Sequence, residues 1–149
     1  MSVLEVITHP NPILREKSQP VIKFDENFKQ FIQDLFETME AYNGIGLAAP
    51  QTGILQRVFV IGFENKKHVF VNPTLSHFSG HREMNEGCLS LPDLLVPVPR
   101  AFRLDVQAFD ETGSPFTMTA DDMLATIIQH EYDHLEGILI IDKNPPIAS

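Results

Sequence analysis

The chain has 149 residues, 43% of them hydrophobic, which is enough for one globular domain over residues 1–149 with a buried core. Its formal charge of −9 argues against binding to DNA, which needs clustered cations, although a small basic patch could still touch the ribosome transiently. Its single cysteine excludes an internal disulfide and no apolar run approaches a membrane span, so we expect a cytoplasmic protein without a membrane partner.

The N-terminal part of the chain predicts an irregular segment followed by one amphipathic helix. Residues 1–24 are interrupted by prolines, which oppose regular structure. Asp25 is a suitable N-cap for the helix, which should end at Asn43-Gly44 with Gly44 as its C-cap. Apolar residues recur at helical spacing and predict one buried face, formed by Phe28, Phe31, Ile32, Leu35, Phe36 and Met39.

The rest of the chain predicts strands and then a second helix. Apolar stretches favour strands at 57–61, 69–75, 78–84, 95–98, 103–109 and 116–119, with a hairpin turn at 110–113. The second helix should have its N-cap in the segment 119–122, where Thr119 is followed by acidic residues, and a left-handed Gly137 after its end. This order predicts an α+β fold, in which mainly antiparallel sheets pack around a central second helix.

The sequence His130-Glu131-Tyr132-Asp133-His134 lies on this second helix and predicts a metal site. Residues four apart share one helix face, so His130 and His134 can bind one ion. Glu131 projects close enough to act as a general base on a water at that ion. A surface helix with two solvated histidines is the alternative interpretation of this pentapeptide alone.

A catalytic metal site of this kind needs a third protein ligand. Longer motifs of this class place a histidine at position 140, which is Ile140 here. Glu136 is too near in sequence to reach the same ion, and Asp142 begins a proline-rich end, so we expect the third ligand upstream. Cys88 is the candidate, because a thiolate binds divalent metals strongly. Its alternative role is that of a small buried hydrophobic residue.

Three motifs follow one another along the chain. They are Gly-x-Gly-x-Ala-Ala-x-Gln at 44–51, Glu-Gly-Cys-x-Ser at 86–90 and Gln-His-Glu-x-Asp-His at 129–134. The first lacks the third glycine of a dinucleotide loop and the Lys-Ser/Thr of a Walker loop, which excludes both. Together the motifs resemble those of the peptide deformylase family, and the resemblance covers nearly the whole chain. Because Pro145 and Pro146 oppose a helix, we expect a short form without the C-terminal helix of many bacterial members.

The resemblance implies an enzyme that removes the formyl group from the N-terminal formyl-methionine of nascent proteins and releases formate. Cys88, His130 and His134 would hold one divalent metal ion. Glu131 would take a proton from the attacking water and pass a proton to the leaving nitrogen. Formyl-methionyl nascent peptides are therefore the expected partners.

The same resemblance implies residues for oxyanion stabilisation and substrate binding. The side-chain amide of Gln51 and the backbone N–H of Leu89 would donate to the oxyanion, next to Gly46. Thr126 is more polar than a methionine pocket requires. The expected lining of the cleft and of that pocket is Ile45, Gly46, Met84, Met123, Thr126 and Ile127.

Two questions stay open: which metal ion binds, and which of the rival functions the chain has. Two imidazoles and a thiolate suit Fe(II), Zn(II), Ni(II) or Co(II), and the family resemblance favours Fe(II). The rival functions are a hydrolase of another N-acyl substrate on the same scaffold and a non-catalytic metal-binding module. Glu131 and Gln51 argue against the second, because a structural metal site needs neither.

Overall fold

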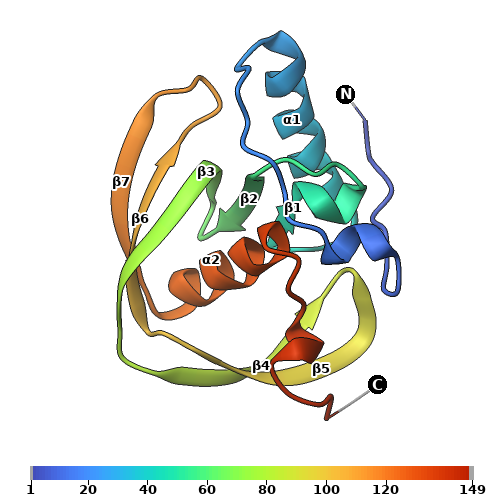
Figure 1. Cartoon of the computed structure of the whole chain (residues 1–149), viewed down its shortest axis with the longest axis vertical. Coiled ribbons are helices and arrows are strands. Elements are labelled where there is room, and N and C mark those ends of the chain that lie inside the picture. The colour runs from blue at the N-terminus through green and yellow to red at the C-terminus, as the bar shows by residue number, and fades with distance from the viewer. Residues whose placement is uncertain (1, 148–149) are drawn as a thin grey trace.

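The computed structural model describes residues 2–147 and has an α+β architecture. Its α-helices are α1 (Glu26–Ala41) and α2 (Asp122–Leu135). The strands are β1 (Gly46–Ala48), β2 (Val58–Phe63), β3 (Lys66–Ser79), β4 (Arg82–Cys88), β5 (Leu91–Arg100), β6 (Arg103–Phe109) and β7 (Pro115–Asp121). Short 3-10 helices are η1 (Pro12–Arg15), η2 (Ala49–Thr52) and η3 (Ile140–Asp142). Figure 1 shows α2 in the middle of the molecule, with β3, β6 and β7 to one side.

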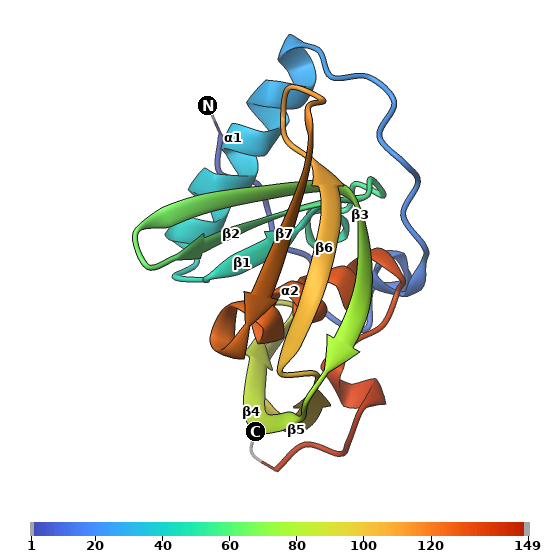
Figure 2. The same ribbon diagram turned by 90° about the vertical axis from the view of Figure 1, so that its left-hand side faces the viewer.

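The strands form two antiparallel sheets. The larger has the order β1-β2-β3-β6-β7, and the smaller consists of β4 and β5. The β3–β6 pairing shifts its register between Val71 and Thr74 and again between Ser76 and Ser79. In the side view of Figure 2, β4 and β5 lie below this larger sheet. The architecture confirms the predicted α+β class with mainly antiparallel strands.

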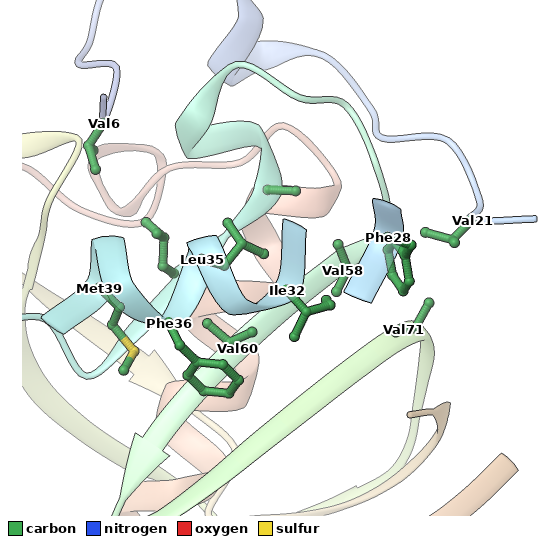
Figure 3. Packing of buried hydrophobic residues seen from close by; sticks show 12 residues of the cluster. Val6, Val21, Phe28, Ile32, Leu35, Phe36, Met39, Val58, Val60 and Val71 are labelled. Carbon is green, nitrogen blue, oxygen red and sulfur yellow. The ribbon is translucent and has the colours of Figure 1, made fainter. Parts of the chain in front are cut away.

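The amphipathic face of α1 packs on the larger sheet, as its spacing predicts. Figure 3 shows the helix side chains facing β2 and β3. Phe31 is partly buried at the margin of this cluster. The buried members from the helix are Phe28, Ile32, Leu35, Phe36 and Met39, which meet Val58, Val60 and Val71 of the strands.

A second cluster holds α2 against the other side of the core. Ala125, Ile128 and Leu135 of the helix are fully buried and pack with Phe59 and Phe70 of the sheet. Burial of a large apolar side chain stabilises a fold by about 1.5–3 kcal/mol. These contacts fix the rotation of α2 about its axis, and that rotation determines where its histidines point.

The residues that end α1 differ from the prediction at one position. Asp25 caps the helix as expected, because its Oδ1 accepts a 2.9 Å hydrogen bond from the N–H of Phe28. Asn43, with φ 58°, takes the left-handed conformation after the helix, so the prediction of Gly44 as C-cap is wrong. Asparagine tolerates this conformation better than most residues. The N–H of Gly44 then donates to the carbonyl of Met39 at 2.8 Å and closes the helix end.

The start of α2 also differs from the prediction, whereas its end does not. The N-cap lies within the predicted segment 119–122, but Thr119 lies inside β7 and is not the capping residue. Asp121 takes the N-cap position, but its side chain makes no capping hydrogen bond and lies 3.9 Å from Arg103. Gly137 follows the helix with φ 74°, as predicted. Neither helix is both long and apolar enough to cross a membrane.

One predicted strand is wrong in its extent, and one strand was not predicted. The stretch 78–84 is interrupted, because β3 continues to Ser79, Gly80 turns the chain with φ 73° and β4 starts at Arg82. The other predicted strands overlap observed ones, and 103–109 coincides with β6. The three-residue β1 escaped prediction because its Gly-Leu-Ala sequence directly after a helix resembles a turn.

Candidate active site

α2 brings the histidines and the glutamate of the metal motif together. The ring centroids of His130 and His134 lie 5.2 Å apart, one helical turn from each other. His134 is buried and His130 nearly so. After the helix, Gly137 is packed so tightly that a Cβ there would lie 2.4 Å from the carbonyl oxygen of Arg15. The end of the helix that carries His134 is therefore fixed against η1.

Cys88 reaches the same point from the end of β4. Its Sγ lies 3.4 Å from Nε2 of His134, and one ligand atom each from Cys88, His130 and His134 lie within 4.8 Å of one another. A thiolate and two imidazoles suit divalent transition metals. Asp142, the downstream alternative, makes an ion pair with Arg15 instead. These three side chains could therefore hold one ion.

Glu86 orients the ring of His130 through its Nδ1 atom. Its Oε1 lies 2.9 Å from Nδ1 of His130. Arg100 donates two hydrogen bonds of 2.9 and 2.8 Å to this carboxylate and a third of 2.6 Å to Asp133. Burial alone would raise the pKa of Glu86, but the hydrogen bonds from Arg100 and His130 hold that pKa below its ordinary value. Because Nδ1 is bonded to Glu86, Nε2 of His130 is left for a metal.

The two histidines differ in pKa. Burial, supported by the charge of His130, lowers the pKa of His134 well below its ordinary value. Burial also opposes a charge on His130, yet hydrogen bonding with Cys88 and Glu86 raises the pKa of His130 well above the ordinary value. A cation that binds here must displace the proton of His130, so its affinity falls as the pH falls.

Glu131 is a buried carboxylic acid next to these ligands. Its Oε1 has no hydrogen-bond partner, and burial, partly offset by the charge of His130, raises the pKa of Glu131 to about 7. A group that titrates near neutral pH suits a general base. Gly46 leaves space for it, because a Cβ there would lie 2.7 Å from Oε2 of Glu131.

Gln51 in η2 faces the same cluster. Its Oε1 accepts a 2.9 Å hydrogen bond from the N–H of Ala48, which holds the carbonyl end of the amide. Its Nε2 donates to Oγ of Ser90 at 3.2 Å and lies 3.7 Å from Sγ of Cys88. The amide nitrogen of Gln51 therefore contacts Ser90 and one of the three candidate ligands, Cys88.

A cavity of about 640 Å³ opens over the cluster. Gln51, Leu89, Cys88, His130 and Glu131 line it. So does the whole set expected for substrate binding, which is Ile45, Gly46, Met84, Met123, Thr126 and Ile127. The Thr126 hydroxyl is buried in this wall without a hydrogen-bond partner.

Sequence reasoning missed parts of the wall and the groups behind it. The missed lining comes from four separate segments and consists of Val6, Thr8, Tyr42, Asn43, Asn85, Pro92 and Asp93. These residues come from the N-terminal segment, the end of α1, β4 and β5, so only the tertiary fold brings them to one cavity. Arg100 was also missed, because a buried charge far from the motifs in sequence gives no local signal. Asp133 lies inside the third motif, but its pairing with Arg100 was not predicted.

Comparison with known proteins assigns the family. The polypeptide deformylase profile matches residues 3–148. The chain belongs to this family. The chain is similar to the peptide deformylase of Heliobacterium modesticaldum, with 43% identity over 143 residues, which cover 96% of this chain and 95% of the relative. It is also similar to that of Brucella suis, with 45% identity over 148 residues, 95% of this chain and 85% of the relative.

Solved peptide deformylase structures share the fold. That from Thermotoga maritima has a TM-score of 0.95 at 38% identity, covering 98% of this chain and all of the other. That from Legionella pneumophila has a TM-score of 0.93 at 39% identity, covering 98% of this chain and 88% of the other. A third, from Synechococcus elongatus in complex with actinonin, has a TM-score of 0.92 at 38% identity, covering 94% and 78%. These likenesses confirm the family resemblance and the predicted fold class.

Proposed function

We propose that this chain hydrolyses the N-formyl group of formyl-methionyl peptides in a metal-dependent reaction. The observation that carries the proposal is the juxtaposition of three ligand atoms within 4.8 Å with an unpartnered buried carboxylate, at one cavity. Family membership supports the same reaction. We propose residues 1–149 as one catalytic domain for it.

The proposed metal ligands are Cys88, His130 and His134. When bound, a divalent ion supplies an acidified water and polarises the formyl carbonyl. Fe(II) is our choice of ion, and Zn(II), Ni(II) and Co(II) fit the same donor set. Cys88 and His130 line the cavity beside Glu131, and a metal site that opens to a cavity suits catalysis better than a purely structural role.

Glu131 is the proposed general base. Among the described residues its Oε1 has no hydrogen-bond partner, so this atom can accept a proton from the attacking water. The same carboxyl group then returns a proton to the leaving nitrogen, which releases formate and a free amine. The space next to Gly46 keeps this side chain unobstructed.

Gln51 and Leu89 are the proposed oxyanion donors. The amide of Gln51 faces the ligand cluster, and Leu89 lines the cavity next to Cys88. Donors that are already oriented stabilise the negative charge that develops on the formyl oxygen. Gly46 belongs to the same constellation because any side chain there would displace Glu131.

The methionine side chain occupies the apolar part of the cavity in this proposal. Its walls are Ile45, Met84, Met123, Thr126 and Ile127, while Gly46 admits the peptide backbone. Nascent chains are the source of such peptides, so a cytoplasmic location and a transient ribosome contact are part of the proposal.

The test is a deformylation assay on metal-loaded protein. Formyl-Met-Ala-Ser should yield formate, whereas acetyl-Met-Ala-Ser should not, and Cys88→Ala should lose both bound metal and turnover. Release of acetate at a comparable rate would favour a general N-acyl hydrolase. Bound metal without release of either acid would favour a non-catalytic metal-binding module.

A further inference from the structure

Ser90 closes the Glu-Gly-Cys-x-Ser motif, and the proposed reaction steps do not use its side chain. It is fully buried in the turn between β4 and β5. Its carbonyl accepts a 2.9 Å hydrogen bond from the N–H of His9, and the N–H of Ile7 donates to the carbonyl of Gln51 at 2.8 Å. One N-terminal segment thus fixes the backbones of Ser90 and Gln51 side by side.

The side chain of Ser90 determines which N–H of Gln51 is available. The N–H of Ala48 holds the Oε1 end of the planar Gln51 amide, and hydrogen bonds at Nε2 are needed to fix the directions of its two N–H groups. One donates to Oγ of Ser90 at 3.2 Å, and the amide nitrogen also donates to Sγ of Cys88 at 3.7 Å, so the second N–H points toward the candidate ligand Cys88. Gln51 is 2% exposed, so bulk water does not compete for either group.

We propose that Ser90 is a positioning residue for deformylation. Its Oγ accepts one N–H of Gln51 and thereby directs the other N–H at the formyl oxygen. This inference rests on the proposed function. Ser90→Ala removes the acceptor, so the amide loses its fixed direction, while the methionine pocket keeps its shape. We expect kcat to fall about 10-fold with KM little changed, because misdirected oxyanion donors weaken transition-state stabilisation.

A double-mutant cycle on metal-loaded protein separates this role from others. Gln51→Leu should lower kcat, and adding Ser90→Ala should lower it no further, because Ser90 acts through Gln51. Bound metal should stay at the wild-type level in all variants. Ser18→Ala is the matched control, since Ser18 is a buried serine whose hydroxyl has no hydrogen-bond partner.

Three results would overturn the inference: an unchanged kcat in Ser90→Ala, a fall of kcat on adding Ser90→Ala to Gln51→Leu that equals its fall in the wild type, or loss of metal.

A direct measurement of the hydrogen bond between Gln51 and Ser90 does not depend on turnover. The NMR shift of one side-chain amide proton of Gln51 should move toward a non-bonded value in Ser90→Ala but not in Ser18→Ala. If Ser90→Ala fails to fold, an NOE from that proton to Hβ of Ser90 in the wild type supports the contact, and its absence overturns it. Wild-type protein that releases no formate would overturn the proposed function instead.

Discussion

At the scale of single residues, Glu131 is a buried carboxylic acid with one oxygen that makes no hydrogen bond to the described residues. Its Oε1 has no hydrogen bond, and its pKa is raised to about 7. We expect Glu131→Gln to keep bound metal and to lose about 10²–10⁴-fold in kcat, because proton transfer is worth that much. Metal analysis together with kcat measured on a formyl-Met peptide tests this. Loss of metal from a folded variant would instead make Glu131 a ligand.

The same residue predicts a pH dependence of stability in protein stripped of metal by a chelator. Burial raises the pKa of Glu131 from 4.5 to about 7, so the fold binds its proton more tightly than the unfolded chain does. Stability is therefore lost as pH rises from 4.5 to 7, by roughly 3 kcal/mol. Glu131→Gln should be more stable than wild type at pH 8 and equal to it near pH 4.5. Urea unfolding at both values measures the difference, and a difference independent of pH contradicts the assignment.

Thr126 offers a residue-scale test of the methionine pocket. Its hydroxyl is buried without a partner in the cavity wall. Thr126→Val replaces that hydroxyl by a methyl group of similar size, which removes the cost of an unsatisfied polar group. We expect a higher melting temperature and a KM about 2–5-fold lower for formyl-Met peptides, with kcat unchanged. A raised KM would show that the hydroxyl contacts the substrate favourably.

At the scale of elements, the end of α2 depends on one glycine. Gly137 has φ 74°, and a Cβ there would lie 2.4 Å from the carbonyl oxygen of Arg15. Gly137→Ala should therefore destabilise the fold by more than about 2 kcal/mol and weaken metal binding through His134. Gly53→Ala is the matched control, because Gly53 has φ 87° but no atom within 4 Å of its Cβ position.

The comparison of these two glycine variants isolates packing from backbone strain. Gly53→Ala should cost only about 1–2 kcal/mol, the strain of a left-handed residue with a Cβ. Thermal unfolding and metal titration of both variants provide the measurements. Equal destabilisation would mean that the chain around Arg15 moves easily and that η1 does not fix the end of α2.

At the scale of the whole molecule, the C-terminal segment has two parts with different roles. Leu139 and Ile140 are buried with Val96 and Val98, whereas Asn144 is half-buried and residues 145–147 are exposed. Deleting residues 144–149 should leave turnover of short formyl-Met peptides nearly intact. Ending the chain at Gly137 should destabilise it, because each buried apolar side chain contributes about 1.5–3 kcal/mol.

Melting temperature and peptide turnover of both truncations test this division. Deleting residues 144–149 removes two hydrogen bonds to β5 from the described part of the tail. Nδ2 of Asn144 donates to the carbonyl of Pro97 at 2.7 Å, and the N–H of Ile147 donates to the carbonyl of Leu95 at 2.8 Å. Loss of turnover in that variant would give the tail a role in catalysis or in substrate access. Unchanged stability after ending at Gly137 would remove Leu139 and Ile140 from the set of stabilising residues. Residues 148 and 149 lie outside the described part of the chain.

The sequence by itself determined the elements that depend on local chemistry. The spacing of the apolar residues in α1, the cap at Asp25 and the left-handed Gly137 follow from helix periodicity and backbone preference. The His pair follows from the same periodicity, because residues four apart share a face. The position of Cys88 as a candidate ligand came from a motif, and the structure brings its Sγ to within 3.4 Å of His134.

Only the tertiary structure determined what surrounds that pair. The pairing of Arg100 with Glu86 and Asp133 joins two strands to α2, and the N-terminal segment reaches Gln51 and Ser90 from far away in sequence. The left-handed Asn43 and the break at Gly80 also escaped prediction. Long-range contacts depend on which surfaces the packed core leaves next to one another. Local sequence determines helix periodicity and caps, but it does not determine these long-range contacts.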